Sequence, residues 1–326
     1  MISILDKIRN KERITLPQIT NHRVCNPSII LQNDAIFSIY KGINFDFEKT
    51  GYSIKNYAGF RVPFTDSQNY LAEISYELIV KKVMFIEDRH IRSNEKALCG
   101  LQDLRIFKWR GMKHALGSAI THGYDGVGEY RERHTTMALF EVSGNFLELV
   151  CFLPSRQQHE KNWMPWVSGD DLFIIYSIYP YEILKFCSNN SIESIKLTDN
   201  FFLDGFRGGS CVIPYGDVFI CIVHKKYKRD TLENKNSFYN FYYSHRLVVF
   251  GLNLEIITVS NEFTFESEDV EFCCGIGFRN QEVFLSYGIN DNTAVLLRCL
   301  TSEFFDVIGL ANIHRAHMEA GLHNGI

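Results

Sequence analysis

Apolar positions along this chain come in short runs that favour β-strands over helices. Five times, a tight polar or glycine-rich run is followed by a short apolar strand, a turn and a second apolar strand. Similar units repeated along most of a chain indicate radial repetition of sheets, as in a β-propeller. We therefore predict an all-β, five-bladed β-propeller with blades approximately within residues 25–300. The predicted strand pairs are Ser28–Ile43, Leu104–Ile120, Trp163–Ile178, Ser210–His224 and Cys274–Tyr287.

The two ends of the chain predict short helices outside the blades. Met1–Arg13 is amphipathic and basic, and Asn312–Ala320 reads as a short terminal helix. We expect the N-terminal helix to pack on the rim of a single domain covering residues 1–326. Because basic amphipathic helices can also lie on anionic lipid, peripheral membrane contact is a second hypothesis for this segment.

The composition supports a large core and excludes several classes of protein. Of 326 residues, 46% are hydrophobic and 14% aromatic, and aromatic residues favour half-buried strands. The net charge of −4 argues against a nucleic-acid partner. No apolar run approaches the roughly 18 residues of a membrane span, and the N-terminus lacks the apolar core of a signal peptide. The nine cysteines include no CxxC pair, which predicts reduced packing residues in a cytoplasmic protein.

The stretch Gly100–Trp109 places candidate chemistry where a predicted strand begins. Asp103 stands two residues before Arg105 and directly before the apolar run. In a propeller the innermost strands point their ends at one central pocket, so we expect the carboxylate of Asp103 on the floor of that pocket.

Basic and amide side chains stand at the ends of other predicted strands. Lys41 and Asn44 follow the first strand pair, and Lys161 comes just ahead of the third. A cation and an amide at a strand end suit an anionic, hydroxyl-rich ligand. The alternative for Lys41 is a solvated charge at the edge of a sheet.

The fourth strand pair combines a cation, two glycines and a histidine. Arg207 precedes Gly208-Gly209, which allow close approach of the backbone to a ligand or an ordinary turn, and His224 lies near the end of the second strand. The planar guanidinium of Arg207 fits phosphate oxygens. His224 alone would be read as a packing residue, but with Arg207 it suggests a phosphate site.

Five short motifs occur in a fixed order along the chain. They are NPSI (Asn26–Ile29), QDLR in place of an E-D-P-R signature (Gln102–Arg105), KNWMPW (Lys161–Trp166), RGGS with a later histidine (Arg207–Ser210 and His224), and Glu271-Phe272 with Gly275, Tyr287-Gly288 and Asp291. In this order they resemble a clan of five-bladed β-propellers that includes β-mannoside phosphorylases and β-mannosyltransferases. They are also similar to propeller-type phosphoribosyltransferases of bacterial capsule and O-antigen assembly. The resemblance spans roughly residues 25–300.

The resemblance implies a role for each matched position. Asp103 matches the catalytic acid/base. Gln102 and Leu104 replace the Glu and Pro usual beside it, and Lys41 stands where an Arg is more usual, which favours a divergent transferase over a plain phosphorylase. The implied phosphate- or donor-binding residues are Arg207, His224, Lys161, Lys41 and Arg105, and the implied sugar-binding residues are Asn26, Asn44, Glu271, Tyr287 and Asp291.

The mixture of carboxylates and cations suits transfer of a phosphorylated sugar. Hydrolysis of a glycoside generally requires two carboxylates about 5–9 Å apart, which Asp103 with Glu271 or Asp291 would have to supply. So many cations are better explained by a phosphate whose charge needs stabilising. We therefore predict a glycosyltransferase acting on a phosphorylated sugar donor and a glycan acceptor, and the resemblance implies that it serves bacterial surface-polysaccharide synthesis.

The identity of the donor stays open at this point. The excess of basic residues favours phosphoribosyl pyrophosphate over a mannose phosphate or nucleotide-mannose. A pyrophosphate donor would normally bring Mg²⁺, but the chain shows no tight Asp-rich motif, so no metal ligands and no other cofactor are predicted. The alternatives are a β-glycoside phosphorylase or hydrolase, and a carbohydrate-binding propeller without catalysis.

Overall fold

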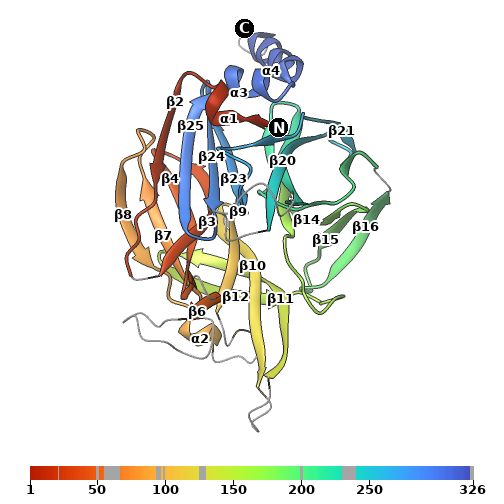
Figure 1. Ribbon diagram of the computed structural model, residues 1–326. Helices are drawn as coiled ribbons and strands as arrows, with labels where there is room; N and C mark the ends of the chain where they lie inside the picture. The colour runs from red at the N-terminus through yellow and green to blue at the C-terminus, as the bar shows by residue number, and fades with distance from the viewer. Residues whose placement is uncertain are drawn as a thin grey trace.

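The chain folds as a β-propeller in which antiparallel sheets stand around a central axis (Figure 1). The computed structural model describes residues 1–20, 22–48, 51–54, 67–92, 97, 100–124, 130–198, 201–229 and 240–323. Within these residues, five sheets have four or more strands, and the remaining sheet is a two-stranded hairpin. Both chain ends lie on one side of the molecule, beside the terminal helices (Figure 1).

The first three sheets are built from strands that succeed one another along the chain. The first consists of β3 (Arg23–Gln32), β4 (Ala35–Ile43), β7 (Ser67–Ile74) and β8 (Val80–Phe85). The second consists of β9 (Leu101–Trp109), β10 (Met112–Tyr124), β11 (Tyr130–Ser143) and β12 (Phe146–Phe152). The third consists of β13 (Met164–Ser168), β14 (Asp171–Ile178), β15 (Tyr181–Phe186) and β16 (Ile192–Thr198).

The last two sheets also take in strands from the N-terminus. The fourth contains β17 (Phe206–Arg207), β18 (Ile213–Tyr215), β19 (Val218–Lys228), β20 (Phe241–Phe250), β21 (Ile256–Val259), β22 (Phe263–Thr264) and β1 (Ile2–Ser3). The fifth contains β23 (Glu271–Arg279), β24 (Glu282–Ile289), β25 (Thr293–Leu300) and β2 (Lys11–Thr15).

Short elements complete the described chain. The two-stranded hairpin is β5 (Phe45–Glu48) with β6 (Gly51–Ile54). The helices are α1 (Ile4–Lys7), α2 (Arg89–Arg92), α3 (Thr301–Val307) and α4 (Ala311–His323), with one 3-10 turn at Phe201–Leu203. The predicted C-terminal helix is therefore confirmed. No helix among the described residues is long and apolar enough to cross a membrane.

All five predicted strand pairs are present as antiparallel neighbours. They are β3–β4, β9–β10, β13–β14, β18–β19 and β23–β24. The turn of the second pair, at Arg110-Gly111, has φ angles of 49° and 80°, the left-handed geometry that suits the twist of a two-residue hairpin. The fourth pair differs in one respect, because β17 and β18 both pair with β19 and the segment with Gly208-Gly209 separates them.

The hydrophobic core is divided among five clusters, each shared by two sheets. Representative pairs are Ile39 with Phe140, Phe107 with Ile174, Trp166 with Val223, Ile222 with Leu285, and Phe284 with Tyr40. The last pair joins the fifth sheet to the first, so the sheets pack as a closed ring. Closing the ring buries both faces of the sheets, as expected for radially repeated β-structure.

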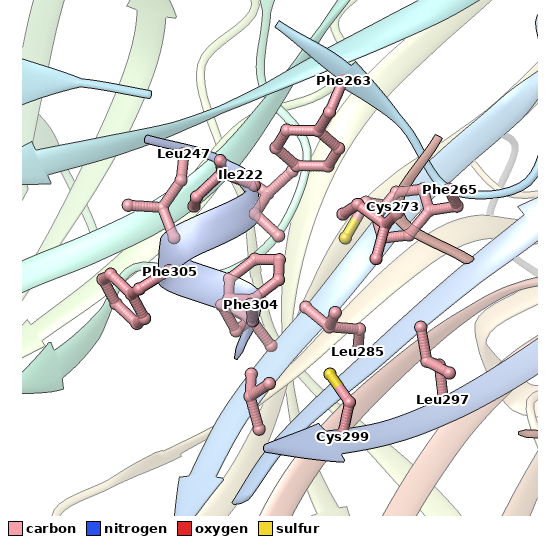
Figure 2. Close-up of a cluster of buried hydrophobic side chains, with 14 of the residues drawn as sticks. Ile222, Leu247, Phe263, Phe265, Cys273, Leu285, Leu297, Cys299, Phe304 and Phe305 are labelled. Atoms are coloured by element: carbon pink, nitrogen blue, oxygen red, sulfur yellow. The ribbon is translucent and has the colours of Figure 1, made fainter. Parts of the chain in front are cut away.

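The cluster between the fourth and fifth sheets also holds the terminal helices. Figure 2 shows Phe304 and Phe305 of α3 among Ile222, Leu247 and Leu285. Ile4 and Ile8, from α1 and its C-cap, are buried in the same cluster. The apolar side of the N-terminal segment therefore packs inside the protein, which removes the feature on which the hypothesis of membrane contact rested.

The prediction of a helix over Met1–Arg13 is wrong for most of its length. Only Ile4–Lys7 is helical, and Lys11–Thr15 forms β2, which pairs antiparallel with β25 from Lys11↔Cys299 to Thr15↔Val295. Without β2, the edge of β25 would expose unpaired backbone groups. The hydrogen bonds of this remote pairing outweigh the local helical preference, and the sheets extend beyond the predicted range of 25–300.

The innermost strands meet at the central axis. The backbone N–H of Ile106 donates to Ser28 Oγ (3.1 Å), and the N–H of Val212 donates to the carbonyl of Pro165 (2.9 Å). A cavity of about 400 Å³ on the axis is lined from all five sheets, by Ile29–Leu31, Ile106–Lys108, Pro165, Val167, Cys211–Pro214 and Ile276–Phe278.

Candidate active site

The candidate site is built on bulges at the starts of the innermost strands. The register shifts in β3 between Cys25 and Ser28, and in β9 at Asp103. Asn26 and Asp103 both have left-handed backbones, with φ of 52° and 53°. Asn and Asp tolerate this conformation best among non-glycine residues, and a bulge turns its side chain away from the normal alternation. The bulges thereby bring the Asn26 and Asp103 side chains within hydrogen-bonding distance.

The carboxylate of Asp103 is held by a cation and an amide from the first sheet. Lys41 Nζ lies 2.8 Å and Asn26 Nδ2 lies 2.9 Å from Asp103 Oδ1. A Cβ added at Gly288 would lie 2.4 Å from Asn26 Oδ1, so only glycine lets β24 approach this amide so closely. The side chain of Asp103 keeps 19% of its surface exposed, so a ligand on the axis can reach it.

Electrostatics keep Asp103 ionised. Burial alone would raise the pKa of Asp103, but the charge and hydrogen bond of Lys41, the hydrogen bond of Asn26 and the charge of Arg105 together lower it well below its usual value. Burial would lower the pKa of Lys41, yet Asp103 and other nearby anionic groups raise it above its usual value. Both partners are therefore charged at neutral pH.

Arg105 is buried at the axis and connects two sheets through hydrogen bonds to backbone carbonyls. It is 1% exposed, its Nε donates to the carbonyl of Gly209 (2.6 Å), and its Nη1 donates to the carbonyl of Asp103 (3.0 Å). The guanidinium carbon lies 5.7 Å from the centre of the Phe272 ring. Arg105, which was predicted to bind the donor, thus connects the second and fourth sheets. Its positive charge acts on the site by lowering the pKa of Asp103.

Lys161 and Arg207 line a cleft of about 570 Å³ between the third and fourth sheets. Both residues are exposed. A Cβ at Gly208 would lie 1.9 Å from the carbonyl oxygen of Asn162, so this glycine permits close packing of two chain segments. Gly208-Gly209 therefore pack closely against the protein's own backbone, which differs from both alternatives, approach to a ligand and an ordinary turn.

His224 is a buried, neutral imidazole at the edge of the site. It is 4% exposed, and its ring centre lies 5.0 Å from that of Tyr243 and 4.8 Å from that of Phe272. Burial, followed by the charges of His245, Arg105 and Arg207, lowers the pKa of His224 well below its usual value. Such a histidine could offer a phosphate an N–H donor but adds no positive charge.

Tyr243 of β20 belongs to the site, although the sequence patterns did not single it out. Burial, followed by Asp291, raises its pKa, and Arg207, Asp103 and Lys41 also act on this phenol. The side chains of Tyr243 and Asp291 are therefore close to the predicted site. The available signal was the pairing of β19 with β20, which places Tyr243 opposite Lys226 and next to His224 on one face.

Two predicted sugar-binding residues lie away from the site. Tyr287 is fully buried, its hydroxyl donates to Glu266 Oε1 (2.7 Å), and its ring stacks on Phe265 with centres 4.2 Å apart. Glu271 is also fully buried and accepts three backbone N–H groups, from Phe265, Glu266 and Ser267, at 2.7–2.9 Å. Burial raises the pKa of Glu271 to about 7. Both residues stabilise the segment before β23, and Asn44 is buried just beyond the end of β4.

The described residues contain no group of three or more His, Cys, Asp or Glu side chains arranged to hold a metal ion. Eight cysteines lie in the described part of the chain, and all are free thiols. The side chains that the structure brings together at the axis are thus Asp103, Lys41, Asn26, Arg105, His224 and Tyr243, with Asp291 and Arg207 close enough to act on them electrostatically.

Solved structures similar to this chain are carbohydrate-active propeller enzymes. A β-1,2-mannobiose phosphorylase from Listeria innocua superposes with a TM-score of 0.59 at 14% identity, covering 93% of this chain and 100% of its own. A GDP-mannose-dependent mannosyltransferase from Leishmania mexicana has a TM-score of 0.59 at 13% identity, with coverages of 91% and 95%. A putative glycosidase from Bacteroides thetaiotaomicron has a TM-score of 0.58 at 12% identity, with coverages of 87% and 93%.

These similarities establish the propeller fold, and the predicted resemblance to mannoside phosphorylases and a mannosyltransferase is confirmed at the level of the fold. No protein-family model matches the sequence, and no curated protein matches it.

Proposed function

We propose that the five sheets are five blades of one propeller and that residues 1–326 form a single domain. Five core clusters, each between two successive sheets, support this reading, as does the axial cavity lined from every sheet. The strand β2 closes the ring from the N-terminus.

We propose that the protein is a glycosyltransferase that uses a phosphate-bearing sugar donor. The observation that carries this proposal is the ionised Asp103, held by Lys41 and Asn26 at the axis. Because Asp103 is ionised, it can accept the proton of an acceptor hydroxyl as that oxygen attacks the anomeric carbon, although its lowered pKa makes it a weak base. Arg207 and Lys161 would stabilise the negative charge that develops on the departing phosphate.

The size of the neighbouring cleft favours a donor larger than inorganic phosphate. Small-molecule sites commonly measure about 300–1,000 Å³, and the cleft with Lys161 and Arg207 holds about 570 Å³. Phosphoribosyl pyrophosphate, a mannose phosphate and a nucleotide-mannose are the donor candidates. Any Mg²⁺ would have to arrive with a pyrophosphate donor. Cytoplasmic synthesis of a bacterial surface polysaccharide is the proposed setting.

Phosphorolysis or hydrolysis of a β-glycoside is the second candidate function. It is favoured by the phosphorylase among the similar structures and by Asp291, which acts on Tyr243 and Lys41 as Asp103 does. With Glu271 occupied by backbone N–H groups, Asp291 would be the second carboxylate that hydrolysis needs.

Thermal unfolding with candidate donors tests the proposal directly. Phosphoribosyl pyrophosphate, mannose 1-phosphate, GDP-mannose and inorganic phosphate would each be added with and without Mg²⁺ to the wild type and to Arg207→Ala. A ligand at 100 times its Kd stabilises the native state by about 2.7 kcal/mol, a shift that is readily measured. We expect one phosphorylated donor to shift the wild type and to lose that effect in Arg207→Ala.

The matched control is Lys185→Ala, which removes a half-buried cation of β15 that pairs with Asp171 (2.9 Å) in the third sheet. It should respond to the donor as the wild type does. A shift with inorganic phosphate and a mannoside together, but with no donor, would favour the phosphorylase. Absence of any shift across the panel would contradict the phosphate site. Ligand binding unaccompanied by turnover, in wild type and Asp103→Asn alike, would indicate a non-catalytic carbohydrate-binding propeller.

A further inference from the structure

The fourth sheet carries a line of basic side chains that leads away from the site and takes no part in the function proposed above. Along β19, side chains alternate between two faces, as in any strand. Ile222, His224, Lys226 and Lys228 share one face, and their register partners on β20 are Leu247, His245, Tyr243 and Phe241. Arg207 on β17 stands opposite His224 and joins the same face. We call Lys226 and Lys228, which continue this face outward from Arg207 and His224, the basic stripe.

The stripe emerges from the core beside the candidate active site. Ile222 is fully buried between the fourth and fifth sheets, and His224 is 4% exposed. Lys226 and Lys228 are exposed. Because a strand rises about 3.3 Å per residue, successive basic groups stand about 7 Å apart. A ligand that starts at Asp103 and follows β19 outward would therefore pass the neutral His224 and then meet the positive charges of Lys226 and Lys228.

Aromatic rings lie beside the cations of the stripe. Lys226 Nζ sits 3.7 Å from the centre of the Phe241 ring, and the Phe241 and Tyr243 rings are 5.5 Å apart. Tyr243 in turn contacts His224 and senses the charges of Asp103 and Arg207. Aromatic surfaces with a few charged groups are typical of sites that bind small molecules and sugars.

The opposite face of β19 has a different role. Lys225 Nζ donates to the carbonyl of Asp204 (2.9 Å) and lies 5.6 Å from the centre of the Phe206 ring. Glu262 accepts from Tyr227 (2.6 Å) and pairs with Arg246 (3.5 Å) on that side. Within the described part of the chain, neither Lys226 nor Lys228 forms an ion pair with a carboxylate. The charges of the basic stripe are thus available to an external anion.

We propose that the basic stripe binds the acceptor, and that the acceptor is an acidic glycan carrying phosphate or carboxylate groups. This inference rests on the proposed glycosyl transfer. The stripe is one side chain wide and continues into a buried histidine that packs on Tyr243 and Phe272, a shape that fits an extended chain entering the site better than a flat lipid surface. Exposed cations raise the local concentration and the association rate of such a chain through their field.

The test is equilibrium binding of fluorescent oligosaccharides to the full-length protein. The probes are an oligogalacturonate for carboxylate, a teichoic-acid-type polyol phosphate for phosphate, and a neutral dextran oligomer. The variants are Lys226→Gln/Lys228→Gln and, as the matched control on the other face of the same strand, Lys225→Gln. We expect the double variant to weaken binding of an acidic probe about tenfold, from two partly screened charge contacts, and Lys225→Gln to leave it unchanged. The difference between wild type and double variant should vanish in 0.5 M salt, since screening removes exposed charge contacts.

Several outcomes would overturn the proposal: no binding of either acidic probe, equal binding of dextran, or equal losses in Lys225→Gln and the double variant. Binding of anionic phospholipid vesicles through Lys226 and Lys228, with none of the oligosaccharides, would assign the stripe to a membrane surface instead. Donor-induced melting shifts, measured on the same samples, separate the two proposals. If the donor binds and the acidic glycans do not, only the stripe proposal fails. If the glycans bind through the stripe and no donor does, the proposed transfer fails.

Discussion

The two ends of the innermost strands contrast sharply, although they belong to the same strands. At the strand starts, bulges at Asn26 and Asp103 gather an ion pair and amide around the axis. Farther along, the same strands enclose an apolar cavity of about 400 Å³, in which Lys108 is the single charged lining residue. Regular alternation turns the apolar side chains to the axis, whereas a bulge breaks alternation and admits polar groups. The polar groups of the candidate site and the apolar groups that stabilise the fold therefore lie at different heights along the propeller axis.

The largest effect is expected from Asp103→Asn at the polar end. Loss of a general base commonly reduces turnover by about 10²–10⁴-fold, and the amide keeps the shape of the side chain, so donor binding should persist. Steady-state assays with the donor identified by thermal unfolding would measure the loss. Asp34→Asn, at an exposed turn beyond the other end of β3, is the control and should remain active. Equal activity of Asp103→Asn and wild type would remove Asp103 from the mechanism.

Ile106→Ala probes the apolar end of the same strand. Ile106 is fully buried, so its truncation should lower the free energy of unfolding by about 2–5 kcal/mol while leaving turnover per folded molecule close to wild type. Urea denaturation and active-site titration would separate the two quantities. Ile79→Ala, at a side chain that is 64% exposed, should change stability by less than about 0.5 kcal/mol. A comparable loss of turnover in Ile106→Ala would show that the two levels are not separate.

Lys41→Met tests the ion pair itself. Removing one partner of a largely buried pair leaves an uncompensated carboxylate, which should cost about 3 kcal/mol at pH 7. In the wild type the lowered pKa of Asp103 contributes stability that is complete above its unfolded value of 3.8 and is lost as pH falls through the lower, folded value. In Lys41→Met burial dominates and raises the pKa, so stability should instead increase as pH falls toward the unfolded value.

Denaturation series between pH 3 and 7 would show this change of slope, and the acidic limb of the activity profile should move upward in pH in the variant. Identical pH dependence of stability in wild type and Lys41→Met would contradict the assigned coupling.

The smallest effect is expected from Tyr243→Phe. The variant keeps the ring that packs against His224 and removes only the hydroxyl that senses Asp103, Asp291 and Arg207. Loss of one hydrogen-bonding group is worth about 1 kcal/mol, or roughly a fivefold reduction in kcat/KM, with little change in the melting temperature. Tyr242→Phe, whose ring stacks on Tyr227, is the neighbouring control. A reduction no larger than in that control would place Tyr243 outside the reaction.

Prediction from the sequence succeeded where the signal is local. Apolar runs flanking polar turns located all five hairpins, and the run Gly100–Trp109 correctly placed Asp103 at a strand start. Prediction failed at Met1–Arg13, because the strand that pairs with β2 is β25, at the far end of the chain. A local pattern cannot register hydrogen bonds to a strand so remote in sequence.

The candidate site divides in the same way. Short motifs singled out Asp103 and Asn26, and the position at a strand end singled out Lys41; Asn26 and Lys41 both donate to Asp103. The motifs could not separate these from Tyr287, because a tyrosine in an alternating strand is compatible with either face. Only the packing of β24 against Phe265 decides that Tyr287 faces the core.

By itself, the sequence determined the five hairpins, where they turn, and that carboxylates and cations stand near their ends. These properties follow from side-chain periodicity and turn chemistry, which act over a few residues. Only the tertiary structure decided that β2 closes the ring, that Asp103 is paired with Lys41, and that Tyr243 joins the site while Glu271 does not. Those outcomes depend on which faces of different sheets meet, and burial there fixes both the partners and the charge states of the buried groups.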